Sequence, residues 1–198
     1  YVVKPFDAVE LVARVGKALA RSTRELGASP TTQLPGADAI AAEIEARIAR
    51  GDHGAVCCYV DLDNFKAFND YFGLARADAV IRQTGDLMRE VVQRTGGAGD
   101  FIGHIAGDDF VMVVDASRVD AVCGELIARF DRLIPLYYDR EERRRGYIEG
   151  QDRWGVLRRF PVMTVSIAAI GIAGMSSFGD VAAATAAGKG LAKAVPTS

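Results

Sequence analysis

Residues 101–114 read F-I-G-H-I-A-G-D-D-F-V-M-V-V and contain two apolar runs separated by a short break. The runs, residues 101–105 and 110–114, are rich in the β-branched and aromatic side chains that favour strands. The four residues between them, A-G-D-D, predict a tight turn. The stretch therefore predicts a β-hairpin that carries two carboxylates at its tip.

A second acidic cluster closes another apolar run. Residues 55–62, A-V-C-C-Y-V-D-L, predict a buried strand with Asp61 at its C-terminal end and Asp63 just beyond it. A hairpin tip and a strand end of one sheet can approach each other, and converging carboxylates repel unless a cation neutralises them. Hard cations such as Mg²⁺ take oxygen ligands and serve phosphoryl transfer. The alternative, that these aspartates merely suit turns, stays open at this point.

Periodicity and helix breakers predict the remaining elements. Helices are predicted at residues 7–26, 38–50, 65–71, 78–94, 119–133 and 178–194, and a final strand lies within residues 162–172. Residues 137–160 are polar, and we expect an irregular excursion or a small hairpin there, with Trp154, Tyr147 and Phe160 packing it onto the body. Few, mostly antiparallel strands with helices packed on one face predict an α+β sandwich.

Composition excludes several classes of function. The chain has 198 residues and a formal net charge of −2, which argues against a general nucleic-acid binder. It contains no run of about 18 apolar residues, so we expect no membrane-spanning helix. Cys57, Cys58 and Cys123 form no C-x-x-C pair, and we expect reduced, buried thiols in a cytoplasmic protein rather than a metal site. The first residue is not Met, and we expect a fragment.

Residues 61–70, D-L-D-N-F-K-A-F-N-D, together with Gly73, Asp78 and the hairpin H-I-A-G-D-D-F, resemble the GGDEF domain of diguanylate cyclases. The resemblance covers residues 32–198 and carries a variant A-G-D-D-F motif. It implies a nucleotidyl-cyclase-like palm domain, an α+β fold with a central, mostly antiparallel sheet flanked by helices. It also implies a bacterial signalling enzyme that condenses two GTP molecules to cyclic di-GMP and pyrophosphate in a homodimer, with no nucleic-acid or membrane partner.

The resemblance assigns metal-binding and catalytic roles to individual residues. Asp61 and the carbonyl of Leu62 would hold Mg²⁺ or Mn²⁺ together with Asp108 and Asp109, in two-metal catalysis. Asp108 would also accept the proton of the attacking 3′-hydroxyl, and Asp109 keeps a carboxylate where glutamate is usual. Lys66 would stabilise charge on the phosphates.

The resemblance also implies a substrate site. Asn69 and Asp78 would read the guanine edge, because an amide both donates and accepts while a carboxylate accepts from N–H groups. The other substrate-binding positions are Phe65, Ala106, Gly107 and Lys193.

Several positions depart from the family pattern. Ala106 replaces the first glycine of the motif, and its methyl group is expected to weaken nucleotide binding without abolishing it. His104 stands where arginine is common, Ala77 replaces a frequent glycine, and Thr197 stands in place of a second phosphate-binding cation. These departures leave an alternative, a degenerate domain that binds GTP or a protein partner without turnover.

The family's inhibitory site is degenerate in this sequence. Its R-x-x-D motif reads G-A-G-D here, with Gly97 in place of the arginine and Asp100 retained. Without that guanidinium, bidentate capture of the product is not expected.

Residues 2–11, V-V-K-P-F-D-A-V-E-L, resemble the end of a response-regulator receiver domain, where a Lys-Pro pair precedes the last helix. The resemblance implies that residues 1–28 are the receiver's C-terminal helix and linker, forming a helical stalk, and that residues 29–198 are the GGDEF domain. An upstream receiver would then control dimerisation of a two-component output domain.

Overall fold

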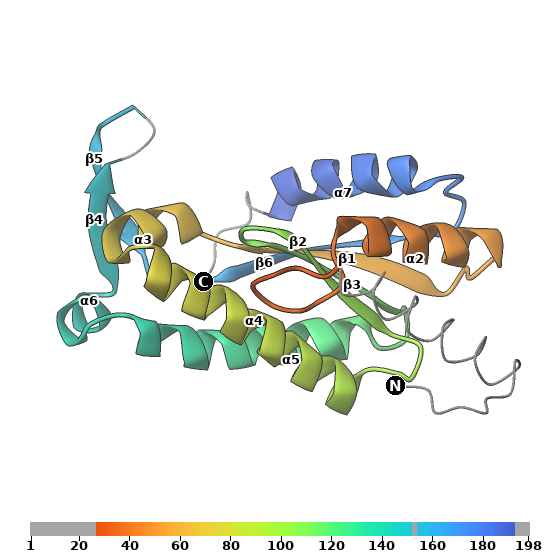
Figure 1. The fold of residues 1–198 in the computed structure, drawn as a ribbon, viewed down its shortest axis with the longest axis horizontal. Helices are drawn as coiled ribbons and strands as arrows, with labels where there is room; N and C mark the ends of the chain where they lie inside the picture. Colours follow the sequence, from red (N-terminus) through yellow and green to blue (C-terminus); the bar gives the residue numbers. More distant parts are fainter. Residues whose placement is uncertain (1–26, 152–153, 193–198) are drawn as a thin grey trace, which may run out of the picture.

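The computed structural model describes residues 27–151 and 154–192, shown in Figure 1. Its helices are α2 (Ala37–Ala49), α3 (Phe65–Phe72), α4 (Leu74–Thr95), α5 (Val119–Leu133), α6 (Arg140–Arg145) and α7 (Phe178–Ala192), with a 3-10 helix at Ile134–Tyr137. Its strands are β1 (Ala55–Leu62), β2 (Phe101–Ala106), β3 (Asp109–Asp115), β4 (Tyr147–Gln151), β5 (Leu157–Pro161) and β6 (Val165–Gly171). None of these helices has the length and apolar character needed to cross a membrane. The stalk predicted at residues 7–26 lies outside the described residues.

Four strands form one antiparallel sheet in the order β2-β3-β1-β6. The pairing of β1 with β3 runs from Ala55 opposite Asp115 to Asp61 opposite Asp109. β1 is central because its sequence is apolar at nearly every position and tolerates cover on both faces. The α+β class with an antiparallel sheet is therefore confirmed.

Helices cover both faces of the sheet, so the expectation of helices on one face was wrong (Figure 1). Cys58 and Val60 of β1 belong to the core under α4 and α5, whereas Cys57 faces the second core under α2 and α7. Successive side chains of a strand point to opposite faces. A continuous apolar run such as A-V-C-C-Y-V therefore needs cover on both sides, and this is why the one-face expectation failed.

Residues 138–151 and 154–161 form the excursion that projects beside α3 (Figure 1). β4 and β5 pair as an antiparallel hairpin, preceded by α6, a helix that the sequence analysis did not predict. Tyr138 anchors the excursion in the core, where its ring lies 5.0 Å from that of Phe68. Trp154 is 74% exposed, so the expectation was wrong for this residue, whereas Phe160 packs against the main core as expected. Buried Tyr138 and Ile148 add to that contact.

The edge strand β2 needs a glycine where α2 crosses it. A Cβ atom at Gly103 would lie 2.4 Å from Cγ1 of Ile40 and 3.0 Å from the carbonyl oxygen of Pro35. Only the absence of a side chain lets both α2 and residues 27–36 approach this strand.

We expect Gly103→Ala to lower the free energy of unfolding by about 1–3 kcal/mol, because the added methyl group overpacks this contact. Urea denaturation followed by circular dichroism measures the change. The control is Gly124→Ala on α5, where a Cβ atom has open space and should stabilise by about 0.5–1 kcal/mol. A Gly103→Ala variant as stable as the parent chain would contradict the packing described here.

Candidate functional site

Two aspartates from different strands face each other at one end of the sheet. Asp61 of β1 lies directly opposite Asp109 of β3, so both side chains lie on the same face. Asp61 is 3% exposed, and Asp108 precedes Asp109 in the turn between β2 and β3. The predicted approach of Asp61 to the acidic hairpin turn is confirmed.

The turn that carries Asp108 depends on a glycine. Gly107 has a φ of +56°, a left-handed conformation that costs glycine little. The pairing of β2 with β3 shifts register between His104 and Ala106, and Ala106 pairs with Asp109. Ala106 is exposed, so its methyl group lies on the outer surface of the hairpin.

Asp63 does not join the facing pair. Its Oδ2 accepts hydrogen bonds from the hydroxyl groups of Thr164, at 2.9 Å, and Ser166, at 2.6 Å. Its backbone N–H donates to the carbonyl of Thr164. Asp63 therefore fixes the start of β6 to the end of β1, a structural role that the D-L-D pattern did not separate from that of Asp61.

The helix after β1 carries two of the predicted substrate-binding residues, Phe65 and Asn69, and the predicted catalytic residue Lys66. The left-handed Asn64, with a φ of +64°, turns the chain from β1 into α3. Phe65 packs against the core. Lys66 is exposed and pairs with Asp70 at 2.5 Å, whereas Asn69 buries its Oδ1 without a hydrogen-bond partner in the described structure.

Asp78 lies on α4, which packs against α3. The buried side chain of Leu62 faces the main core, so only its backbone carbonyl can serve the site. Lys193 and Thr197 lie outside the described residues.

The carboxylate oxygens of Asp61 and Asp109 at the strand ends are the kind of ligand that a hard cation prefers. Like charges placed directly opposite each other on neighbouring strands destabilise a sheet, and a divalent cation between Asp61 and Asp109 would relieve that repulsion. Within the described ranges, no three His, Cys, Asp or Glu side chains come together as a metal site. Carbonyl, phosphate or water oxygens would therefore have to complete the shell.

Gly97 and Asp100 lie at the opposite end of the sheet, beside Asp115, which pairs with the first residue of β1. Oδ2 of Asp100 accepts from the backbone N–H of Gly97 at 2.7 Å. A Cβ atom at Gly97 would lie 3.5 Å from Nη1 of Arg118, which donates to the carbonyl of Gly96. Arg118 therefore lies beside position 97, where the family's motif has an arginine.

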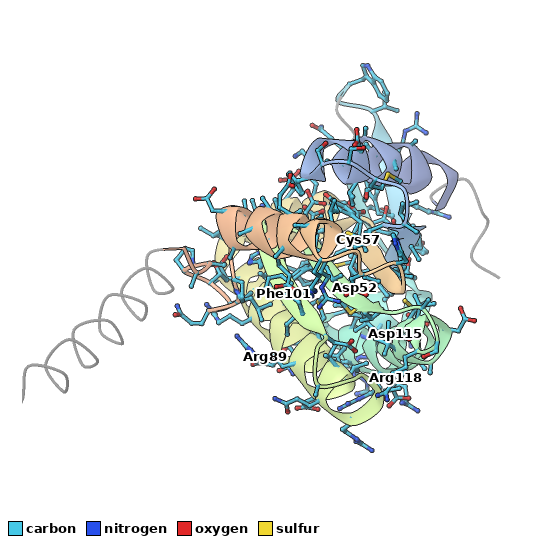
Figure 2. All side chains as sticks on the ribbon, turned by 90° about the vertical axis from the view of Figure 1, so that its right-hand side faces the viewer. Asp52, Cys57, Arg89, Phe101, Asp115 and Arg118 are labelled. Atoms are coloured by element: carbon cyan, nitrogen blue, oxygen red, sulfur yellow. The ribbon has the colours of Figure 1, made fainter. Side chains whose placement is uncertain are left out.

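A hollow of about 400 Å³ surrounds this point and is lined by three arginines and three aspartates. They are Arg47, Arg50, Arg118, Asp52, Asp100 and Asp115. Figure 2 labels three of them, Asp52, Asp115 and Arg118. Arg47 already pairs with Glu43 at 2.6 Å and donates to the carbonyl of Gly99. No sequence spacing signals this cluster, because tertiary contacts bring its members together.

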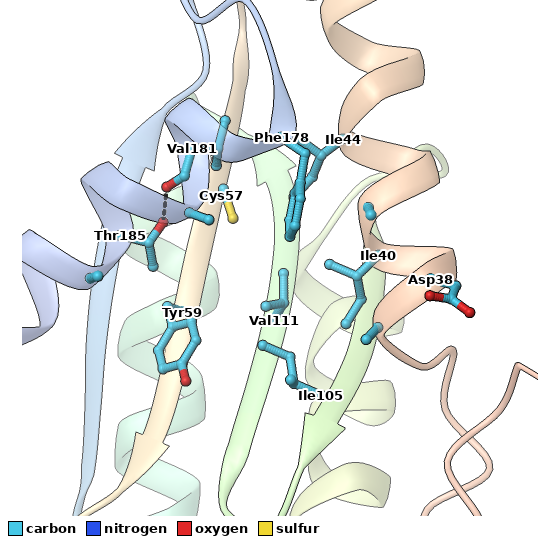
Figure 3. Close-up of a pocket in the computed structure, with 14 residues that line it drawn as sticks. Asp38, Ile40, Ile44, Cys57, Tyr59, Ile105, Val111, Phe178, Val181 and Thr185 are labelled. Carbon is cyan, nitrogen blue, oxygen red and sulfur yellow. Dashed lines mark hydrogen bonds between the residues drawn. The ribbon is translucent and has the colours of Figure 1, made fainter.

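An apolar cavity of about 470 Å³ lies between α2 and α7 over the sheet (Figure 3). Ile40, Ile105, Val111 and Phe178 point into it. Burial raises the pKa of the Cys57 thiol in its wall to about 11, against the opposing effect of the Thr185 hydroxyl, so that thiol is neutral at pH 7. The side chains that line this cavity are mostly apolar. The carboxylates of the candidate site lie outside it, at the ends of β1 and β3.

Sequence comparisons relate the chain to known proteins. Residues 29–142 match the family described as "Diguanylate cyclase, GGDEF domain". An uncharacterized signaling protein of Caulobacter vibrioides is 33% identical over 106 residues, covering 52% of this chain and 12% of that protein. The diguanylate cyclase DgcP of Escherichia coli is 36% identical over 62 residues, covering 31% of this chain and 17% of DgcP. The chain thus spans a small part of these curated relatives.

Solved structures share the fold. The coiled coil and GGDEF domain of DgcB from Caulobacter crescentus, crystallised with c-di-GMP, has a TM-score of 0.67 at 22% identity, covering 94% of this chain and 91% of that one. The S helix-GGDEF-EAL structure of Vibrio cholerae LapD has a TM-score of 0.69 at 13% identity, covering 92% and 38%. At these identities the likeness shows the fold.

We expect Asp61→Asn to raise the free energy of unfolding in metal-free buffer by about 0.2–1 kcal/mol, because it removes one of two facing charges. Adding Mg²⁺ should raise the melting temperature of the parent chain more than that of the variant. Thermal denaturation with and without Mg²⁺ measures both effects. Asp63→Asn is the control: it should lower stability through Thr164 and Ser166 and keep the response to Mg²⁺. Equal Mg²⁺ responses in the parent chain and Asp61→Asn would argue against a cation at this pair.

Proposed function

We propose, because the chain belongs to the GGDEF family of diguanylate cyclases, that it condenses two GTP molecules into cyclic di-GMP. In each of two steps the 3′-oxygen of one GTP bonds to the α-phosphorus of the other. The bond from that phosphorus to the bridging oxygen breaks, and pyrophosphate leaves. The observation that carries the proposal is the placement of Asp61 opposite Asp109, with Asp108 in the adjoining turn.

Asp108 would accept the proton that the 3′-hydroxyl loses. It lies in the two-residue turn, half-buried, beside the facing pair. Between them, Asp61, the Leu62 carbonyl, Asp108 and Asp109 would hold two Mg²⁺ or Mn²⁺ ions, with phosphate or water oxygens completing each shell, and these ions would supply Lewis-acid stabilisation of the phosphate oxygens. A carboxylate at position 109 keeps this donor set, although its side chain is one methylene shorter than glutamate.

Lys66 would move from its present partner to the phosphates. Its ammonium group is exposed and pairs with Asp70, four residues along α3. An exposed pair of this kind contributes at most about 1 kcal/mol, so exchanging Asp70 for a phosphate costs little. Lys193 would bind the phosphate tail.

Asn69 and Asp78 would recognise the guanine base. Asn69 keeps a buried Oδ1 that has no hydrogen-bond partner in the described structure, and guanine offers N–H donors to such an acceptor. Asp78 would accept from the same edge of the base. Phe65, Ala106 and Gly107 would border the nucleotide, and the methyl group of Ala106 would weaken its binding.

Catalysis would need two copies of the chain, because each site holds one GTP. The response-regulator context belongs to the same proposal: residues 1–28 would continue from an upstream receiver domain that controls dimerisation. The resemblance of residues 2–11 to the end of a receiver supports this.

We expect Asp108→Ala to lower the rate of cyclic di-GMP formation by at least about 100-fold, because the proton acceptor is lost. Chromatography of a GTP and Mg²⁺ incubation measures the product. Asp120→Asn, an exposed aspartate on α5, is the control and should keep the parent rate. If the parent chain forms no product even when it is fused to a dimerising coiled coil, the proposed cyclase activity is overturned. GTP binding by calorimetry would then indicate a nucleotide-binding module, and no binding would indicate a protein-interaction module.

We expect added cyclic di-GMP to leave the initial rate of pyrophosphate release unchanged. Position 97 offers no guanidinium group, and Arg118 beside it already donates to the carbonyl of Gly96. A coupled pyrophosphate assay measures the rate. Inhibition that disappears in Arg118→Ala would contradict this expectation and would assign the role of the missing arginine to Arg118.

A further inference from the structure

The ring of His104 connects two parts of the chain beside the acidic turn. The side chain is 3% exposed. Its Nδ1 lies 2.7 Å from the hydroxyl oxygen of Ser29 and 3.2 Å from that of Thr32. Its Nε2 lies 2.9 Å from the carbonyl oxygen of Gly107. One side chain therefore joins residues 27–36, the entry segment, to the turn.

The partners of the ring determine which nitrogen carries the proton. A carbonyl oxygen only accepts, so Nε2 of His104 donates to Gly107. In the neutral ring, Nδ1 then accepts from the hydroxyl group of Ser29. Phe110 stacks on the ring with centroids 4.4 Å apart and an interplanar angle of 17°, which fixes the plane of the imidazole.

The entry segment that contacts the ring is itself held in place by three interactions with the rest of the domain. The backbone N–H of His104 donates to the carbonyl of Pro35 at 2.8 Å, which attaches the segment to β2. Arg89 of α4 donates to the carbonyl of Thr32. The side chain of Leu34 is 2% exposed and belongs to the main core. The segment is therefore attached to the sheet, to α4 and to the core.

The turn itself has little other packing around Gly107. A Cβ atom at that position would meet nothing within 4 Å, and Ala106 before it is exposed. Asp108 follows directly. The bond from His104 to the Gly107 carbonyl therefore orients the peptide unit that leads into Asp108.

We infer that His104 is a positioning residue, which sets the place of Asp108 by donating a hydrogen bond from β2 to the Gly107 carbonyl. The inference rests on the proposed function for its catalytic consequence. His104 acts through Gly107 and does not itself touch substrate. Because the ring bonds to Ser29 and Thr32 at its other side, a displacement of the entry segment also reaches the acidic turn.

Two substitutions separate the two sides of the ring. His104→Gln can place an amide N–H near the position of Nε2, which keeps the donor to Gly107 and loses the contact with Ser29. His104→Asn is shorter and places its polar atoms near Nδ1, which keeps the Ser29 side and loses the bond to Gly107. Both remove the same aromatic ring, so each is the matched control for the other.

We expect His104→Asn to lower kcat by about 10- to 100-fold, because a catalytic group misplaced by about 1 Å loses that much rate. His104→Gln should retain kcat within about threefold, which corresponds to a change in activation free energy of less than about 0.7 kcal/mol. Dissociation constants for GTP, measured by calorimetry, should be similar in both variants. Thr84→Val removes a buried hydroxyl group from α4 away from the turn and should change the melting temperature without changing kcat.

Amide hydrogen exchange of residues 105–109 provides a readout that does not need turnover. Exchange should speed up in His104→Asn and remain near the parent rate in His104→Gln. A purely structural role would instead lower the melting temperature in both variants and leave kcat of the folded chain unchanged. Parent-like exchange in His104→Asn would overturn the inference whether or not the parent chain makes product. Absence of product with faster exchange would overturn only the proposed function.

Discussion

The antiparallel pairing of β1 with β3 is the constraint on which the rest of the site depends. Its register places Asp61 opposite Asp109, at the same end as the turn that holds Asp108. A slip by one residue would turn Asp61 toward the core under α4 and α5, because alternate side chains of a strand face opposite sides. Apolar packing on both faces of β1 opposes such a slip, so burial of Cys58 and Val60 on one face and Cys57 on the other also holds the acidic pair in place.

The residues around the acidic pair have separate structural roles. Asp63 uses its carboxylate to bind Thr164 and Ser166, which fastens β6 beside β1 and leaves Asp61 to the site. Gly107 supplies the left-handed turn, and His104 holds the carbonyl of that glycine. The hydrogen bonds of Asp63 and His104 and the apolar packing of β1 thus hold the two facing charges in place.

Much of this arrangement could be predicted from the sequence, and the failures have physical causes. The strand at residues 55–62, the hairpin and the approach of Asp61 to the turn follow from local pattern and turn chemistry. The helix α6 was missed because R-E-E-R-R-R has no apolar periodicity. Helices cover both faces because residues 55–60 are apolar on both sides of the strand, a signal in the sequence that the one-face expectation did not use.

Partners distant in sequence account for the other failures. Arg118 lies beside Gly97 only because the fold brings the start of α5 to the end of α4, and no spacing in the sequence records that. His104 meets Ser29 across 75 positions of the chain for the same reason. The measurement that tests the account most directly is a crystal structure with Mg²⁺ and a non-hydrolysable GTP analogue. The account predicts a cation held by Asp61 and the acidic turn, with guanine against Asn69; a nucleotide bound elsewhere, or a cation away from Asp61, would contradict it.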